Sequence, residues 1–481
     1  MKYKLSFLYD YVLPNMILPN ALITEFAIVN YIHTMHSTKM NFFDTNDNPS
    51  WGSGAASFNN RSMMDLIFEE KLGLFPNSLI TKVDDSNIHA HCYRRSLDIL
   101  EESIYFGKKQ GITKYVYPIR ITPHFDFFAG SELRVPRKLN GEYFWKYMSA
   151  ESLIDVQQRN AVIFLDYGQE NYIERESYIK IHNALEHSSL PASQIILALN
   201  SFNSKEIYEF WFPPDERRIT VQNWPFVMCN TSYHYAATVD NDKTIADFNN
   251  SRSYYRKHHF LFKIRRPRAF RMALLYRMAS DGLLEKADWS CLTSVTCNSS
   301  RINHLADKYK FVPNMAAIEA VHSAIPHTLD SEPDIAANQV SAWTDKHSEP
   351  YKDSYFYVCT EMFTHGEYKS LTEKIFKPMA NLQPFLFLAN CNVLKTLREL
   401  GFKTFSPMID ESYDDEPDEV TRLNMIYSEI HRLSSMSKED LHIWYWSMED
   451  ILRHNHEHLL KIHIDEPHSL ALFKCLLDKT S

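Results

Sequence analysis

The feature that most constrains the fold of this chain is the segment 354–405, in which the patterns of buried strands and of helices alternate. Residues 355–359 (YFYVC) form an apolar run rich in aromatic side chains, which predicts a buried strand. A polar loop follows, and Thr372 stands where a helix N-cap is expected. Residues 385–389 (FLFLA) then predict a second buried strand. The segment therefore predicts strands and helices that alternate in a parallel sheet.

The same segment predicts an anion site. Residues 393–400 have helical spacing and are closed by Gly401 at the expected C′ position, and residues 403–405 predict one more short strand. In such a unit, the helix N-terminus lies at the carboxyl edge of a parallel sheet, where anions and above all phosphates bind. Because Glu373 and Lys374 directly follow the N-cap, their side chains are expected at this edge.

The rest of the chain extends the pattern over two α/β domains. A chain of 481 residues is too long for one core. Strands and helices of a first domain are predicted at residues 115–121, 161–165, 178–187, 195–199, 205–211 and 218–221. A second domain begins with a strand at 259–264 and a helix at 267–282, after a polar linker at 233–256. Helices are also predicted at 94–105, 423–433 and 441–459.

Composition excludes several classes of protein. The net charge of −9 argues against nucleic acid as a partner. With 11 glycines and neither GxGxxG nor GxxxxGK[ST], a glycine-rich phosphate loop is not expected, so side chains and helix ends must bind any phosphate. The seven cysteines are scattered without a CxxC pair, which favours a reducing compartment. No 18 apolar residues run together, so we expect a cytoplasmic protein without a membrane span. The oligomeric state is left open.

A basic cluster marks the start of the second domain. It follows a strand and enters a helix, so some of its guanidinium groups should reach the carboxyl edge and clamp a diphosphate. The alternative is a solvated basic turn, or contacts with the acidic segment 410–419. The cluster comprises Arg256, Lys257, Lys263, Arg265, Arg266, Arg268 and Arg271.

Lys374 indicates an anion site more specifically than the basic cluster does, because a cation in the first turn of a helix is unfavourable for that helix. A bound anion would compensate its placement. Glu373 could accept hydrogen bonds from ribose hydroxyls, and Glu361 at the end of the preceding strand faces the same crevice. The alternative is an ordinary capped helix with a surface lysine.

The pattern FYVCTEM…LTEKIFKPM…PFLFLA…LKTLRELGFKTF…IDESYD, within residues 259–413, resembles the donor-binding half of the α-1,3-fucosyltransferase-type glycosyltransferases. Those enzymes have a strand ending in Phe-Glu-Asn, a short loop, Tyr-Val-Thr-Glu-Lys, a helix and a Pro-led strand. Here Thr360, Glu361 and Met362 replace the first triplet, the loop is longer, and Ala389 with Asn390 stand where a glycine is common. These departures leave the identity of the sugar open.

The resemblance implies an α/β chain of the GT-B type, with two facing Rossmann-like domains, an N-terminal extension and C-terminal helices. It implies metal-independent, inverting transfer from a nucleotide sugar, GDP-fucose in the namesake enzymes, to a glycan hydroxyl. Arg271, with Arg266 and Arg268 as near alternatives, and Lys374 would neutralise the diphosphate. Glu373 would hold the ribose, Glu361 would contact the sugar or the loop, and Thr372 would cap the helix. The resemblance also implies that no cofactor is required.

The implied domains are an N-terminal extension at 1–110 that belongs to or packs on the acceptor domain, and the acceptor domain itself at 111–245. A donor domain at 246–410 and C-terminal helices at 411–481, packing across the domains, complete the chain. The other interpretations are the same fold with another nucleotide sugar, and a binding or scaffold protein that keeps the fold without turnover.

Inverting transfer needs a carboxylate that removes the proton of the acceptor hydroxyl. Glu170 is the candidate, because it follows the strand at 161–165 in a loop where a crevice residue is expected. Asp166 and Glu174 compete for this role, and each of the three can also be an ordinary loop acid.

Two sequences have the form of metal motifs. Residues 240–242 (DND) match a DxD, but they follow no clear strand and are interpreted as a turn. His454, Glu457 and His458 form an HxxEH, which a class of zinc peptidases uses. They also lie in an amphipathic helix whose apolar stripe already explains it. We therefore predict no metal site.

Overall fold

The computed structural model describes residues 3–9, 100–106, 112, 114–120, 148–167, 173–214, 218–225, 239–292, 298–327, 329, 349–361, 363–364, 366–462 and 465–481. Its contacts divide the chain into two compact units, Met1–Asn230 with His463–Ser481, and Thr231–Ile462. Each unit contains one parallel sheet.

The first unit is built on a six-stranded parallel sheet in the order β2-β1-β3-β4-β5-β6. Its strands are β1 Tyr3–Tyr9, β2 Leu100–Phe106, β3 Tyr115–Arg120, β4 Ala161–Tyr167, β5 Ile195–Leu199 and β6 Thr220–Asn223. Its helices are α6 Ala150–Gln157, α7 Arg175–His187, α8 Ser204–Trp211 and α21 Asp465–Thr480, with a short 3-10 turn at Ala192–Gln194.

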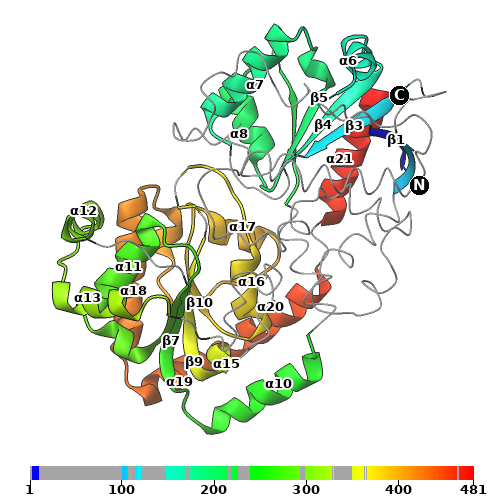
Figure 1. Cartoon of the computed structure of the whole chain (residues 1–481). Coiled ribbons are helices and arrows are strands. Elements are labelled where there is room, and N and C mark those ends of the chain that lie inside the picture. The colour runs from blue at the N-terminus through cyan, green and yellow to red at the C-terminus, as the bar shows by residue number, and fades with distance from the viewer. Residues whose placement is uncertain are drawn as a thin grey trace, which may run out of the picture. The chain divides into compact units, whose positions relative to one another are not determined.

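Apolar β-branched and aromatic residues explain why the centre of this sheet forms. All five residues of β5 are buried, as are residues 161–165 of β4, because helices cover both faces of a parallel sheet. The helix α21, the last element of the chain, packs against β1, β3, β4 and β6 (Figure 1).

The second unit has a four-stranded parallel sheet in the order β10-β9-β7-β8. Its strands are β7 His258–Ile264, β8 Ala287–Cys291, β9 Ser354–Thr360 and β10 Phe385–Leu388. Its helices are α10 Asn241–Asn250, α11 Ala269–Ser280, α12 Ser299–Tyr309, α13 Met315–Ala324, α15 Glu349–Asp353, α16 Glu373–Ala380, α17 Val393–Glu399, α18 Glu419–Ser434, α19 Lys438–Trp446 and α20 Glu449–Lys461. Short 3-10 turns lie at Ser251–Ser253, Leu283–Lys286 and Ser412–Asp415.

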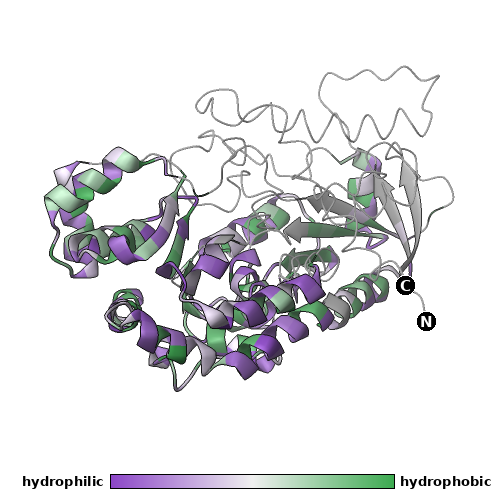
Figure 2. Ribbon diagram, turned by 90° about the horizontal axis from the view of Figure 1, so that it is seen from below, coloured by the Kyte–Doolittle hydropathy of each residue, from purple (hydrophilic) through white to green (hydrophobic). Residues whose placement is uncertain are grey.

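Helices cover both faces of the second sheet. Figure 1 shows α11 and α18 on one side of it and α16 and α20 on the other. The helix α18 packs on β7 and β10, and α16 packs on β9. Polar and apolar residues alternate along the helices drawn in Figure 2, as is typical of helices with one face toward a core. The seven residues of β9 are all buried.

These observations confirm the predicted α/β class with two parallel sheets and C-terminal helices. Residues 94–105 were predicted as helix, and this is wrong for the described part, because Leu100–Phe106 form the strand β2. Pairing along the whole length of β1 decides the conformation there. Local spacing could not reveal this pairing, because the partner strand lies nearly a hundred residues earlier.

Three further predictions of elements are corrected. Residues 403–405 form no strand, because the main chain of Lys403 pairs with the side-chain amide of Asn455 at 2.8 Å in both directions. The DND sequence is no turn but the start of α10, where the Asp240 carboxylate caps the helix by accepting from Lys243 N at 3.0 Å. The single helix expected at 441–459 is broken into α19 and α20 around Ser447 and Met448.

Gly401 ends α17 in the left-handed conformation, with φ of +90°, as predicted for C′. A Cβ there would lie 2.9 Å from His458 Nε2, whereas a Cβ on Gly282, with φ of +72°, would meet nothing within 4 Å. We expect Gly282→Ala to cost about 1 kcal/mol from backbone strain alone. Gly401→Ala should cost about 2–3 kcal/mol, because the contact with His458 adds to a similar strain.

Urea unfolding of both variants measures this difference. In a His458→Ala background the cost of Gly401→Ala should fall to that of Gly282→Ala. Equal costs for the two glycine substitutions in the wild-type background would contradict the role of His458.

Within the described ranges, each helix is too short or too polar to serve as a membrane-spanning segment.

Candidate functional site

The second sheet reverses its strand order between β7 and β9, since the chain passes from β7 to β8 on one side and later to β9 on the other. At such a switch point, the loops that leave two neighbouring strands diverge and open a crevice at the carboxyl edge. Ile264 ends β7 and Thr360 ends β9. The residues that follow these two strands therefore lie at the position where α/β sheets bind ligands.

Arg271, in the first turn of α11, connects the two loops. Its side chain is buried, and Nη2 donates to Thr360 O at 3.1 Å and to Glu361 O at 2.6 Å. Nη1 donates to Arg266 O at 3.2 Å. Burial lowers the pKa of the Arg271 guanidinium, and the charge of Glu361 opposes that shift. Arg271 thus brings a positive charge to the exit of β9 and fixes the backbone there.

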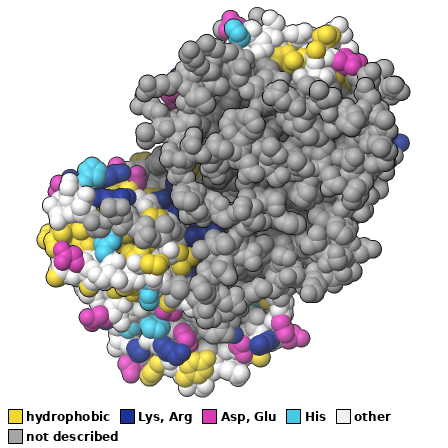
Figure 3. Space-filling view, in the orientation of Figure 1, with side chains coloured by type: hydrophobic (Ala, Val, Ile, Leu, Met, Phe, Trp, Pro, Cys, Tyr) yellow, Lys and Arg dark blue, Asp and Glu magenta, His cyan; other side chains and the backbone are white. Residues whose placement is uncertain are grey.

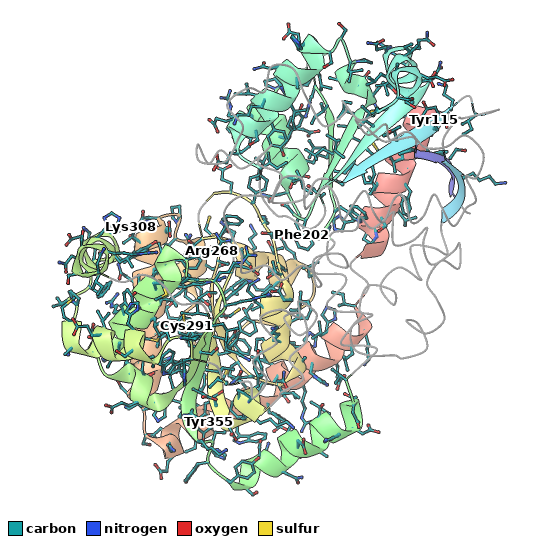
Figure 4. The ribbon with its side chains drawn as sticks, viewed as in Figure 1. Tyr115, Phe202, Arg268, Cys291, Lys308 and Tyr355 are labelled. Atoms are coloured by element: carbon teal, nitrogen blue, oxygen red, sulfur yellow. The ribbon has the colours of Figure 1, made fainter. Side chains whose placement is uncertain are left out.

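Arg266 and Arg268 lie in the same loop. Arg268 takes the N-cap position of α11, and its guanidinium lies 5.1 Å from the ring centroid of Phe363, in the loop after β9. Arg266 is exposed, and its carbonyl also accepts from Arg268 N at 2.9 Å. In Figure 4, Arg268 lies toward the end of the second sheet at which Cys291 ends β8.

Glu361, the first residue after β9, ties that strand to the start of α16. Its side chain is buried, and Oε1 accepts from Thr372 N at 3.0 Å and from Thr372 Oγ1 at 2.5 Å. Thr372 is the N-cap residue of α16, as predicted, but its hydroxyl makes no capping bond within the helix. The carboxylate of Glu361 instead binds the N-cap residue itself and so ties the start of α16 to the exit of β9.

The Lys374 ammonium lies among oxygens of the same cluster. Nζ donates to Thr372 Oγ1 at 2.8 Å and to Glu373 Oε1 at 2.9 Å, and it lies 3.6 Å from Glu361 Oε2. Burial favours a lower pKa for Lys374, but the charges of Glu361 and Glu373 outweigh it and raise the pKa. Burial also favours a higher pKa for Glu373, but the charges of Lys374 and Lys377 lower it. Lys374 and Glu373 are therefore both ionised at neutral pH.

The structure thus brings together seven predicted site residues at one edge of one sheet. They are Arg266, Arg268, Arg271, Glu361, Thr372, Glu373 and Lys374. The expectation that a bound anion compensates Lys374 needs revision, because two carboxylates already do so. Arg271 and Lys374 lie with Glu361 and Glu373, and Arg266 and Arg268 add two further cations to this edge.

The residues proposed for proton removal lie in the first unit. Glu170 lies outside the described residues. Asp166 belongs to the end of β4, and its side chain is likewise not described. Glu174 is exposed at the N-cap position of α7 and makes no capping hydrogen bond.

Two residues that the sequence did not reveal hold the loop between β9 and α16. Arg422 of α18 is 1% exposed, and it donates to the carbonyls of Thr364, Ala389 and Glu416. Asn390 Nδ2 donates to Gly366 O at 2.9 Å. The sequence offers no signal for Arg422, because an arginine in an amphipathic helix is normally expected on the solvent face.

The histidines of the HxxEH sequence contact the end of α17. His454 Nε2 lies 2.9 Å from Gly401 O and His458 Nε2 lies 2.7 Å from Leu400 O, with the two rings stacked at 5.7 Å. No group of three or more metal-ligating side chains occurs among the residues that the structure describes.

On the face of the second unit visible in Figure 3, acidic and basic side chains are interspersed.

The ion pair between Glu373 and Lys374 makes stability depend on pH. Because the folded protein holds the pKa of Glu373 below its ordinary value of 4.5, the pair stabilises the fold fully above pH 4.5. That contribution is lost as the pH falls through the folded pKa. We expect wild type to exceed Glu373→Gln in free energy of unfolding at pH 7, and the difference to vanish in acid. Urea unfolding between pH 7 and pH 3 measures it, and a difference that does not change with pH would contradict the assignment.

The chain matches no family model and no curated protein in sequence. It is similar to the structure of α,α-trehalose 6-phosphate synthase from Burkholderia multivorans, with 9% identity, a TM-score of 0.36, and coverage of 76% of this chain and 72% of that one. It is similar to a glycosyltransferase from Rickettsia africae, with 11% identity, a TM-score of 0.33 and coverage of 99% of both chains.

A third similar structure is the N-terminal domain of trehalose-6-phosphate phosphatase from Candida albicans. Here the identity is 9% and the TM-score 0.36, over 100% of this chain and 98% of that one. We draw nothing on function from likenesses this slight.

Proposed function

We propose that this protein is a glycosyltransferase of the GT-B type that binds a nucleotide sugar at the carboxyl edge of the second sheet. The observation that carries the proposal is the cluster of Arg271, Glu361, Glu373 and Lys374 at the switch point between β7 and β9. It combines cations for a diphosphate with carboxylates for hydroxyl groups, and a nucleotide sugar presents both kinds of group.

In this reaction the leaving group is a nucleoside diphosphate, so negative charge grows on its oxygens as the bond to the sugar breaks. Lys374 and Arg271 supply the positive charge at that place, and Arg266 and Arg268 lie in the same loop. Side chains then do what a metal ion does in other glycosyltransferases, and we propose a metal-independent reaction. Glu373 accepts hydrogen bonds from the ribose, and Glu361 holds the loop against α16.

For the acceptor half we propose inversion at the sugar carbon, with Glu170 as the base that takes the proton of a glycan hydroxyl. GDP-fucose is the favoured donor, because the Thr-Glu-Lys sequence that opens α16 resembles that of the fucosyltransferase type. The alternatives are another nucleotide sugar with the same fold, or a carbohydrate- or nucleotide-binding protein without turnover.

A thermal-shift screen against GDP, UDP, CMP and their sugars tests the proposal. One nucleoside diphosphate and its sugar should raise the melting temperature, since a ligand that binds only the folded state stabilises it by mass action. Slow release of that nucleoside diphosphate from the sugar, with EDTA present, would distinguish the enzyme from a binding protein. A screen without any shift would contradict the proposed site, and a strict requirement for Mn²⁺ would contradict the metal-independent reaction.

A further inference from the structure

In the described structure, the Lys374 ammonium is already paired with oxygens of the protein. It donates to Thr372 Oγ1 and Glu373 Oε1 and lies 3.6 Å from Glu361 Oε2. An ammonium has three N–H donors; hydrogen bonds to Thr372 and Glu373 use two of them, and Glu361 Oε2 lies at ion-pair distance. A diphosphate that approaches Lys374 therefore competes with carboxylates that already neutralise the ammonium.

The three partners differ in how firmly they are held. Glu361 is buried and already accepts two hydrogen bonds from Thr372, which itself belongs to the start of α16. The Glu373 side chain is 17% exposed and lies next to Lys374 in sequence. Neighbouring residues on a helix do not face each other, so their contact requires both side chains to bend toward one another. Glu373 is thus the partner that is easiest to release.

We infer that Lys374 exchanges the Glu373 carboxylate for the diphosphate when the donor binds, and that the exchange unmasks Glu373 for the ribose. The inference rests on the proposed function, because it concerns the same anion site. Before binding, Oε1 of the carboxylate that would accept the ribose hydroxyls accepts a hydrogen bond from Lys374. The site then binds a ligand that carries both a diphosphate and a ribose more tightly than a ligand that carries only one of them.

The exchange couples two halves of one ligand. A ligand with only a ribose finds the Glu373 carboxylate paired with Lys374. A ligand with only a diphosphate must break that ion pair. A nucleoside diphosphate breaks the ion pair once and then makes contacts through both its diphosphate and its ribose. By linkage, each half then favours binding of the other by the same factor. The ion pair thereby selects diphosphate-bearing nucleotides against nucleosides and free pyrophosphate.

Isothermal titration with inorganic pyrophosphate tests the exchange without any ribose contact. Glu373→Gln keeps the size of the side chain but removes the charge that competes for Lys374. We expect it to bind pyrophosphate about fivefold more tightly than wild type, since a partly exposed ion pair contributes up to about 1 kcal/mol. Near-ultraviolet circular dichroism checks that the variant is folded.

Two controls separate the exchange from a general change in charge. Glu399→Gln removes an exposed carboxylate from the last turn of α17 and should leave the pyrophosphate affinity unchanged. In a Lys374→Met background, Glu373→Gln relieves only direct repulsion, so its gain in affinity should be clearly smaller than in wild type.

The outcomes distinguish the inference from the proposed function. If wild type binds pyrophosphate and Glu373→Gln gains no more than Glu399→Gln, the exchange is refuted while the anion site stands. An equal gain with and without Lys374 refutes it in the same way. If neither wild type nor any variant binds pyrophosphate, the anion site itself and the proposed function fall together with the exchange.

Discussion

Replacement of Lys374 by alanine is expected to lower kcat/KM for donor hydrolysis about 10³-fold. The substitution removes the cation that faces the leaving diphosphate. It also leaves Glu361 and Glu373 with no ammonium between them, so two carboxylates then repel the phosphates. The measurement is release of nucleoside diphosphate from the donor sugar that the thermal-shift screen selects.

Lys395 provides the matched control, because it is an exposed lysine in the first turn of the neighbouring helix α17. Lys395→Ala changes the net charge by the same amount and should leave hydrolysis within about twofold of wild type. If Lys374→Ala hydrolyses the donor as fast as Lys395→Ala, the diphosphate of the donor is not bound at α16 during hydrolysis.

Replacement of Arg422 by alanine is expected to destabilise the second unit by about 4 kcal/mol. Arg422 is 1% exposed and donates to three main-chain carbonyls, which the substitution leaves buried without these donors. Each such loss costs about 1–3 kcal/mol, and a charged donor makes it larger. The readout is urea unfolding followed by hydrogen exchange in peptides from residues 354–462.

Arg432 lies on the same helix, and its side chain is 47% exposed in an ion pair with Glu429. Arg432→Ala should therefore cost less than about 1 kcal/mol. Arg422→Lys should recover part of the loss, because an ammonium can still reach some of the carbonyls. Similar costs for Arg422→Ala and Arg432→Ala would show that the three carbonyls find other donors.

The strands and helices of both sheets were largely predictable because they are local patterns. Residues 161–165, 195–199 and 355–359 are apolar runs bounded by polar loops, and each forms a central strand. The start of α16 and the left-handed end of α17 follow from Thr372 and Gly401 in the same way. Such signals depend only on neighbours in sequence.

Features that depend on distant partners were missed. The strand β2 exists because it pairs with β1, and residues 403–405 are kept out of the sheet by the side chain of Asn455. The clustering of charged residues at the second sheet was predicted, but the compensation of Lys374 was not. It depends on Glu361, which is thirteen positions earlier and reaches the ammonium only through the fold of the loop.

The return of α21 has a consequence for the order in which the chain acquires its structure. The first unit takes its strands from the first half of the sequence and its last helix from the C-terminal segment, whereas the second unit lies wholly between them. During synthesis, all of the second unit is therefore made before α21. Domains usually fold from the N-terminus onward. Here the unit encoded later in the sequence is expected to fold first, before α21 covers the apolar face of the first sheet.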